Sequence, residues 1–323
     1  MFLICGEALF DIFIHDHIAA DANTIPLVAR AGGSPLNVSI GLARLGREVA
    51  MLAGISTDLL GDRLVAVLES EQVSTRFIRR KPAPTTLSFV QQNSDGKPDY
   101  VFYGEGAADR CLASTDIEMS LDGIQCVHLG SYSLVVPPSA DSLYQLAVKA
   151  SAKRIISLDP NVRPTVEPDL QCWRDRIDSL IDLVDVIKLS DEDMSLLYPE
   201  KDPESILQRW RNRGVQLTIM TQGEAGALLI SQRGDAQIEA YHIHVADSVG
   251  AGDSFQAIVL DELMALKSNY GDHWHTHLNS EHLKIIGESA TIGAAITCSR
   301  SGADLPTRAE LSQYKNQAAD HLL

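Results

Sequence analysis

The 323 residues are 45% hydrophobic, which suits a large globular core and excludes a disordered chain. The 27 Lys and Arg residues stand against 43 Asp and Glu residues, for a net charge of −16, and no basic run is longer than Arg79-Arg80-Lys81. This balance argues against a nucleic-acid partner, and five scattered cysteines without a CxxC pair argue against a disulfide framework or a zinc site.

Short apolar runs typical of strands recur along the chain, with amphipathic stretches between them. They are residues 2–5, 49–53, 126–129, 155–158, 184–189, 217–221 and 227–230. Alternation of this kind predicts an α/β fold, with a mostly parallel sheet flanked by helices.

Two segments differ, because residues 11–30 and 85–103 alternate apolar and polar side chains around turn residues. They predict a small antiparallel sheet with no helix to cover it, and a lid over the active site is the natural use of such a sheet. The expected organisation is a core of residues 1–10, 32–84 and 104–323 and a lid of residues 11–31 and 85–103. The alternative is a pair of ordinary hairpins at the edge of the main sheet.

The segment Asp247–Phe255 (DSVGAGDSF) follows an expected strand at Tyr241–Val245 and precedes a helical pattern that begins at Phe255. Gly250 and Gly252 let the backbone turn so that consecutive N–H groups point at one anion, and the helix dipole adds partial positive charge. The turn is therefore predicted to hold phosphate oxygens.

Asp253 would repel an anion held by this turn, so we expect its carboxylate to face an attacking hydroxyl and to accept its proton. The alternative is that Asp253 only caps the helix. No Walker A motif occurs in the sequence, and a dinucleotide fingerprint fits poorly because its third glycine is missing.

The Asp247–Phe255 segment resembles the C-terminal signature of the PfkB, or ribokinase-like, carbohydrate kinases, and Ala31–Val38 (AGGSPLNV) resembles their second signature. The resemblance implies a ribokinase-like three-layer α/β/α fold with a small antiparallel β lid. It also implies an ATP-dependent kinase in which Asp253 is the base and Gly250, Ala251 and Gly252 form the anion hole.

The resemblance also assigns the sugar side of the site. It implies contacts from Asp11, Gly32, Gly33, Asn37 and Arg163, together with Asp253. A carboxylate and an amide suit adjacent hydroxyls, and the glycines admit the sugar close to the backbone. Without the resemblance, these residues would be turn glycines, surface polar residues or, for Arg163, a loop cation paired with an acid.

On the nucleotide side, the resemblance implies six residues near ATP. They are Lys188, Thr221, Gly223, Gly226, Gly252 and Gly302. Asn161 and Asp193 are the expected contacts to magnesium, through water. The family usually has Asn and Glu where this chain has Ser190 and Asp193, and this acidic run could instead be the solvated start of a helix. Activation by potassium is left open.

Within the family, residues 102–109 and Gly130-Ser131 fit the fructokinase branch, so phosphorylation of D-fructose to fructose 6-phosphate is expected. A 2-keto-3-deoxygluconate kinase commonly has an Arg where this chain has Gly104-Glu105, and purine nucleosides are a further alternative. An inactive sugar-binding or regulatory protein is the alternative from another class. The expected partners are the sugar, ATP and a second copy bound through the lid. No stretch reaches membrane-spanning length, which favours the cytoplasm.

Overall fold

The computed structural model describes residues 1–14, 23–92 and 98–320. Its main sheet has eight strands in the order β14-β13-β12-β11-β10-β9-β1-β4. Their bounds are β1 Phe2–Cys5, β4 Val49–Leu52, β9 Cys126–Gly130, β10 Ile155–Asp159, β11 Val186–Ser190, β12 Leu217–Thr221, β13 Ala227–Ser231 and β14 Asp235–Ile238. The pairs from β4 to β12 are parallel, and β13 and β14 add antiparallel neighbours at one edge. The mostly parallel sheet expected from the apolar runs is confirmed.

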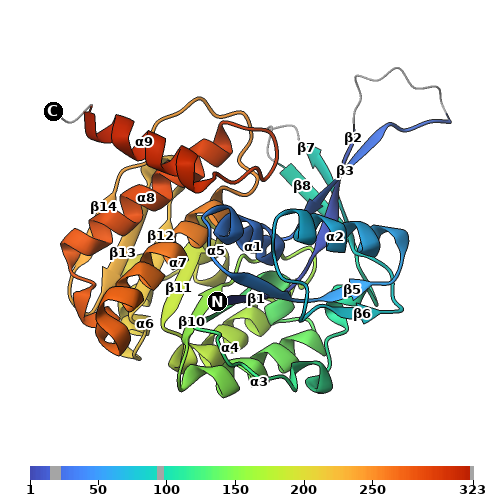
Figure 1. Cartoon of the computed structure of the whole chain (residues 1–323), viewed down its shortest axis with the longest axis horizontal. Helices are drawn as coiled ribbons and strands as arrows, with labels where there is room; N and C mark the ends of the chain where they lie inside the picture. Colours follow the sequence, from blue (N-terminus) through green and yellow to red (C-terminus); the bar gives the residue numbers. More distant parts are fainter. Residues whose placement is uncertain (15–22, 93–97, 321–323) are drawn as a thin grey trace.

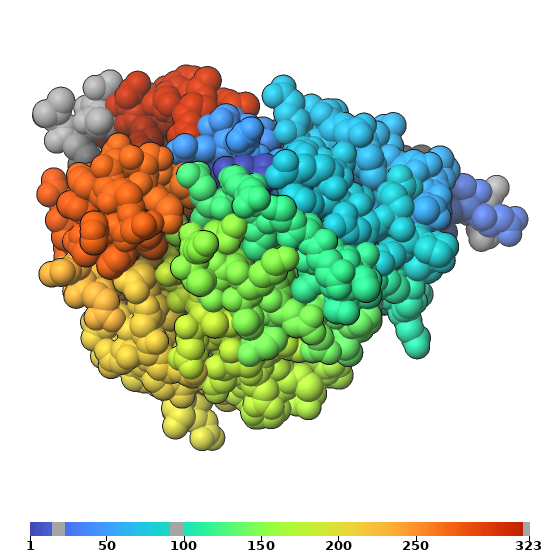
Figure 2. Space-filling model, turned by 60° about the horizontal axis from the view of Figure 1, so that its bottom comes forward, coloured from blue at the N-terminus to red at the C-terminus, as the bar shows by residue number. Residues whose placement is uncertain are grey.

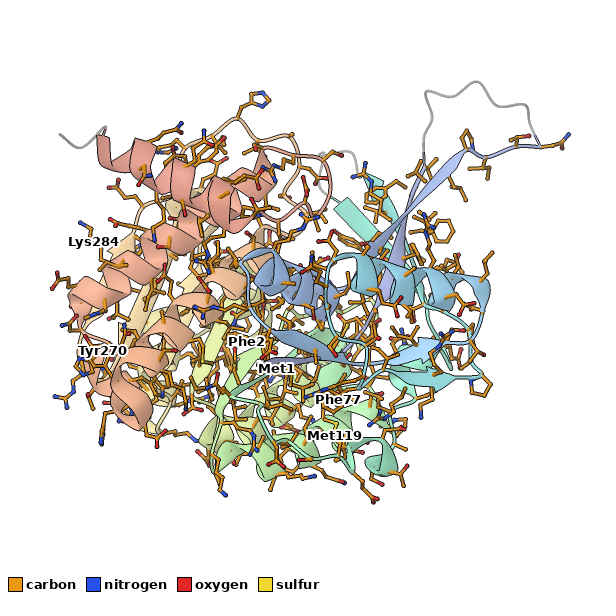
Figure 3. The ribbon with its side chains drawn as sticks, in the orientation of Figure 1. Met1, Phe2, Phe77, Met119, Tyr270 and Lys284 are labelled. Carbon is orange, nitrogen blue, oxygen red and sulfur yellow. The ribbon has the colours of Figure 1, made fainter. Side chains whose placement is uncertain are left out.

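Helices cover both faces of this sheet (Figure 1). One layer contains α1 Ser34–Arg44, α2 Leu59–Ser70, α7 Ala251–Tyr270, α8 Ser280–Cys298 and α9 Arg308–Asp320. The other contains α3 Ser139–Ser151, α4 Leu170–Leu180, α5 Asp191–Leu197 and α6 Pro203–Asn212. Successive residues of β1 point into opposite layers, so all four are apolar. Figure 3 contrasts Phe2 of β1, which is buried, with Lys284 of α8, which points away from the molecule. The three-layer fold is therefore confirmed.

Four strands form a separate sheet in the order β3-β2-β7-β8, with bounds β2 Leu9–Ile14, β3 Leu27–Gly32, β7 Leu87–Gln92 and β8 Pro98–Tyr103. Each hairpin pair is antiparallel, and the inner strands β2 and β7 run parallel to one another. We call these four strands the small sheet. Its blue strands β2 and β3 project from the body of the molecule (Figure 2). Residues 15–22 and 93–97 of the predicted lid lie outside the described residues.

The prediction of a strand at Tyr241–Val245 is wrong, because this segment belongs to none of the sheets in the described residues. The chain leaves the sheet after β14, and the backbone N–H groups of Ala246 and Asp247 donate to Cys298 O at the end of α8. Tyr241 packs edge-on against Tyr314 of α9. The alternating pattern therefore comes from an extended segment that is half-buried on a helix.

Helix α1 packs closely on α7. A Cβ on Gly41 would lie 2.9 Å from Ala257 Cβ and 2.5 Å from Leu305 Cδ2, so glycine is needed for this approach. The contact places the first turn of α1 beside the first turn of α7. None of the helices in the described ranges is both long and apolar enough to cross a membrane.

Candidate active site

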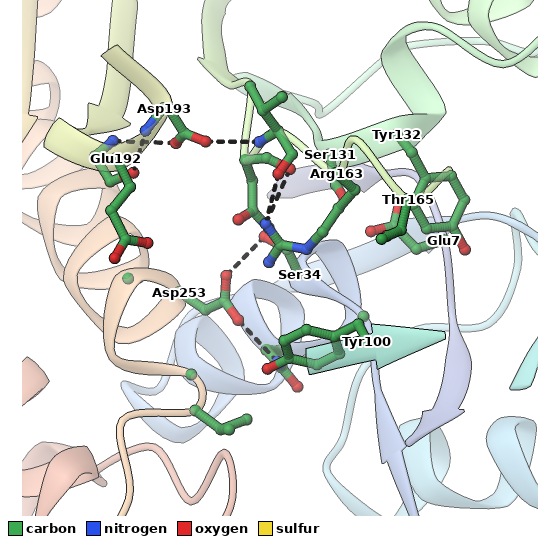
Figure 4. A pocket seen from close by; sticks show the side chains of 18 of the residues that line it. Glu7, Ser34, Tyr100, Ser131, Tyr132, Arg163, Thr165, Glu192, Asp193 and Asp253 are labelled. Atoms are coloured by element: carbon green, nitrogen blue, oxygen red, sulfur yellow. Dashed lines mark hydrogen bonds between the residues drawn. The ribbon is translucent and has the colours of Figure 1, made fainter. Parts of the chain in front are cut away.

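A cavity of about 630 Å³ opens where the parallel strands of the main sheet end (Figure 4). Nine of the residues singled out in the sequence line it: Asp11, Gly33, Asn37, Asn161, Arg163, Asp193, Gly250, Gly252 and Asp253. Leu9 and Asp11 of β2 and Tyr100 and Phe102 of β8 also contribute, so the small sheet forms part of the wall. Residues from both ends of the chain therefore meet in one cavity.

Asp253 occupies the first turn of α7, with only 8% of its surface exposed. Ser34 Oγ donates to its Oδ1 at 2.6 Å, and Asn37 Nδ2 donates to its Oδ2 at 2.8 Å. Burial raises the pKa of Asp253, and these two hydrogen bonds oppose the rise. Its oxygens bond to side chains of α1 and make no capping bond to α7, so the geometry argues against a purely capping role.

Gly250 precedes α7 with φ 80° and ψ 0°, a left-handed conformation that favours glycine. A Cβ at this position would also lie 2.6 Å from Ala303 Cβ. The turn therefore brings Gly250 and Gly252, at the start of α7, into the cavity wall together with Asp253. Ala251 begins the helix and is not part of the cavity wall.

Asp11 lies on β2, on the wall provided by the small sheet. Burial raises its pKa to about 6, although the positive charge of Arg163 opposes the rise. A Cβ on Gly32 would lie 2.2 Å from Asp11 Oδ2, and one on Gly33 would lie 2.9 Å from Glu7 O. The two glycines therefore make room for the Asp11 carboxylate and for the β1–β2 connection.

Arg163 follows β10 in a loop with Asn161. Its guanidinium lies 5.9 Å from the centre of the Tyr100 ring, and its Nη1 donates to Val162 O at 3.0 Å. Asp193 fastens this loop to α5, because its Oδ1 accepts from Val162 N at 2.8 Å and its Oδ2 from Ser190 N at 3.1 Å. The acidic run does start a helix, and Asp191 and Glu192 are exposed, but Asp193 in the first turn of α5 is buried.

A buried ion pair lies beneath the glycine turn. Lys188 Nζ is 2.8 Å from Asp159 Oδ2, and both side chains are at most 4% exposed. A Cβ on Gly252 would lie 3.6 Å from the same ammonium, so Lys188 places positive charge under the start of α7. The other oxygen, Asp159 Oδ1, is buried and has no hydrogen-bond partner within the described ranges.

Of the residues assigned to the nucleotide, Gly252 lines the cavity, whereas Lys188, Thr221, Gly223, Gly226 and Gly302 do not. Thr221 pairs in register with Ser190, which does line it. Gly223 and Gly226 belong to the β12–β13 turn, and a Cβ on Gly226 would lie 1.8 Å from Ile238 O, which gives that glycine a packing role. Gly302 N donates to Asp247 Oδ2 at 2.8 Å, so its loop borders the segment that leads into the glycine turn.

Within residues 1–14, 23–92 and 98–320, no group of three His, Cys, Asp or Glu side chains could hold a metal ion directly. Asp193 uses both carboxylate oxygens for backbone N–H groups, although each oxygen retains a second lone pair. The unpartnered Asp159 Oδ1 adds a further acceptor. These acceptors fit a magnesium ion that keeps its waters and is carried by phosphate.

The sequence interpretation assigned no role to several residues of the wall. They are Glu7, Ser34, Tyr100, Ser131, Tyr132, Thr165 and Glu192. Ser131 could have been found from its place directly after β9, at the carboxyl edge of the sheet. It has φ 58°, and Asn161, also in the wall, has φ 40°. Such strained conformations in non-glycine residues often occur at functional sites.

The sequence is similar to those of known carbohydrate kinases. Residues 6–310 match the model of the pfkB family carbohydrate kinases. A fructokinase of Rhizobium leguminosarum bv. trifolii is 33% identical over 263 residues, which cover 81% of this chain and 79% of that protein. Fructokinase-2 of Solanum lycopersicum is 31% identical over 314 residues, covering 94% of this chain and 93% of its own.

Solved structures share the fold. The fructokinase from Xylella fastidiosa with bound ATP has a TM-score of 0.87 and 25% identity, and the match covers 98% of both chains. A fructokinase from Vibrio cholerae, solved in a form with fructose, ADP and calcium ion bound, has a TM-score of 0.82 and 24% identity. That match covers 97% of this chain and 98% of the other.

Proposed function

The chain belongs to the pfkB family of carbohydrate kinases, and we propose that it transfers the γ-phosphoryl group of ATP to the C6 hydroxyl of D-fructose. The observation that carries this proposal is the position of Asp253. Its buried carboxylate lies at the start of α7, in a cavity that is also lined by the polar side chains of Asp11 and Asn37. The similarity to proteins named fructokinase supports fructose as the sugar substrate. The products are fructose 6-phosphate and ADP.

In the proposed reaction, Asp253 accepts the proton of the C6 hydroxyl as the oxygen of that hydroxyl bonds to the γ-phosphorus. The bond from phosphorus to the bridging oxygen of ADP breaks at the same time. A raised pKa suits this role, because a carboxylate buried away from water is a stronger proton acceptor. Backbone N–H groups of Gly250 and Gly252, with the α7 dipole, stabilise the negative charge on the phosphoryl oxygens, whereas the Ala251 N–H donates to Ser248 O at 3.3 Å.

Around the sugar, we assign hydrogen bonds to Asp11 and Asn37 and close backbone approach to Gly32 and Gly33. Asp11 supports this assignment because its carboxylate lies in the wall and accepts strongly from hydroxyl groups. Arg163 lies between this wall and the catalytic turn and is proposed to bind oxygens of the sugar or of the transferred group.

On the nucleotide side, we assign Lys188 and Gly252 to the phosphates. Lys188 supplies buried positive charge beneath the turn. The further contacts are Thr221, Gly223, Gly226 and Gly302. Asn161 and Asp193 are proposed to hold a hydrated magnesium ion, which when bound neutralises phosphate oxygens. Turnover in potassium and in sodium salts, at equal ionic strength, tests activation by potassium.

The small sheet is proposed to close over the sugar and to pair with the small sheet of a second copy. Apolar side chains on and beside its strands support this pairing: Ile14, Ile25, Leu27, Val28, Val101 and Tyr103 are each at least 36% exposed. Sedimentation should give a dimer for the native protein and a monomer for Val101→Lys with Tyr103→Lys. A monomeric native protein at micromolar concentration would exclude this interface.

The function is tested by incubating the protein with ATP, magnesium and single sugars, with detection of ADP and of the phosphorylated product. The panel contains fructose, glucose, ribose, 2-keto-3-deoxygluconate and adenosine. We expect the highest kcat/KM with fructose, and fructose 6-phosphate as the product by ³¹P NMR. A higher kcat/KM with another compound would assign that compound instead, and no sugar-dependent ADP release would support a non-catalytic sugar-binding protein.

A further inference from the structure

A second buried carboxylate belongs to the same cavity. Glu7 lies in the connection between β1 and β2, lines the cavity and is 1% exposed. Ser133 Oγ donates to its Oε2 at 2.7 Å. In Figure 4, Glu7 lies with Tyr132 on one side of the cavity, Glu192 and Asp193 lie on the other, and Asp253 is between them. Glu7 is therefore remote from the phosphate side of the catalytic carboxylate.

Packing alone does not explain an acidic residue at this position. In the described part of the chain, Glu7 forms no ion pair with a Lys, Arg or His, and the groups that bond to its carboxylate are the neutral hydroxyls of Ser133 and Ser131 and its own backbone. Burial raises its pKa to about 7, and the charge of Asp109 adds to the rise. A glutamine could accept the same bond from Ser133 without the cost of burying an ionisable group. The carboxylate is thus expected to serve something that enters the cavity.

The neighbours of Glu7 indicate the chemistry of that ligand. Ser131 and Tyr132 line the same side of the cavity, and Tyr132 OH donates to Asp109 Oδ2 at 2.8 Å. This wall therefore offers carboxylate and hydroxyl groups, which suit a neutral polyol with several hydroxyl donors.

We propose that Glu7 is a specificity-determining residue that accepts hydrogen bonds from the C1 and C2 hydroxyls of the ketohexose, the end furthest from C6. The assignment rests on the proposed function, because C6 must lie at Asp253 for C1 and C2 to reach Glu7. An ionised Glu7 accepts these bonds best, so the KM for the sugar should fall as pH rises through about 7.

The test compares native protein with Glu7→Gln, using fructose, 1-deoxyfructose and 2,5-anhydromannitol, which lacks the C2 hydroxyl. With fructose, Glu7→Gln should raise KM about tenfold to a hundredfold, the usual worth of a hydrogen bond to a charged group, and change kcat less than threefold. Each analogue retains only one of the two hydroxyls, so with either analogue the same substitution should raise KM by a smaller factor than with fructose. The pH dependence of KM near 7 should also disappear.

Two further variants keep the outcome decisive. Ser133→Ala removes one of the two hydroxyls that bond to Glu7 while leaving the carboxylate, so it should raise KM far less than Glu7→Gln. Glu7→Asp retains the charge and is used if Glu7→Gln does not fold, as judged by thermal melting. It should then raise KM for fructose more than for either analogue. Equal losses on fructose and on both analogues, or equal losses in Ser133→Ala and Glu7→Gln, would overturn the proposal.

Native turnover on fructose is measured first, which separates the two proposals. If fructose is not phosphorylated, the proposed function fails. Glu7 is then tested on the sugar that the panel identifies, with analogues lacking each hydroxyl remote from the phosphorylated position. An unchanged KM in Glu7→Gln for that sugar would also overturn the role of Glu7.

Discussion

Replacement of Asp253 by Asn separates proton transfer from every other property of the site. The amide oxygen can accept from Asn37 Nδ2, and the amide nitrogen can donate to Ser34 Oγ, which is able to accept. The two contacts to α1 therefore survive, while no basic oxygen remains to take the proton. We expect the free energy of unfolding to be unchanged or increased, because a buried ionisable group is removed.

The glycine turn, Lys188 and Arg163 remain in this variant, so the turnover rate loses only the contribution of the general base. A general base typically contributes a factor of about 10² to 10⁴ to turnover, which corresponds to roughly 3 to 5 kcal/mol of the activation barrier. The assay is coupled ADP release at saturating fructose and ATP, with calorimetric binding of ATP as the control for an intact site. Turnover within tenfold of the native value, at unchanged ATP affinity, would refute the assignment of Asp253.

Three further results are expected. Asp11→Ala should raise the KM for sugar at least tenfold and leave ATP affinity within threefold, because Asp11 lies on the small-sheet wall; the reverse pattern in calorimetric titrations would mean the two sites are exchanged. Burial raises the pKa of Asp185 to about 6, so the native state binds more protons than the unfolded state between about pH 4 and 6, and the free energy of unfolding falls as pH rises through that window. Asp185→Asn should therefore gain stability over the native protein between pH 4.5 and 7.5 in urea titrations, and a constant difference would contradict this. Hydrogen exchange in the small sheet should slow with sugar, and slow further with a non-hydrolysable ATP analogue; protection confined to residues 250–255 would contradict closure of the sheet.

The central strands could be predicted from the sequence because both of their faces are buried, so each reads as a short continuous apolar run. Edge strand β14 could not be predicted in this way, because Ile238 is the only buried residue among its four. Tyr241–Val245 shows the converse error, because its alternation matched a strand although no neighbouring strand pairs with it. Alternating apolar and polar residues indicate that one face of a segment is buried, but they do not indicate whether a strand or a helix covers that face.

The candidate site divides in a similar way. The turn at Gly250–Asp253 could be recognised because its function depends on local backbone geometry, which glycines reveal. Ser34 and Glu7 could not be assigned roles, because their importance arises from contacts made only after folding. Ser34 bonds to Asp253 across 219 positions of the chain, and Glu7 bonds to Ser133 across 126. A single sequence carries no local pattern for such pairs.

The contact between α1 and α7 also bears on when the enzyme becomes competent during its synthesis. Asn37 leaves the ribosome 216 residues before Asp253, the carboxylate that it binds. At roughly 5 to 20 residues per second, this interval is on the order of ten to forty seconds. A nascent chain that has already built β1, α1 and the small sheet still lacks the proton acceptor. ATP therefore meets no functional phosphotransfer centre until residues 251–270 have emerged and α7 has docked on α1.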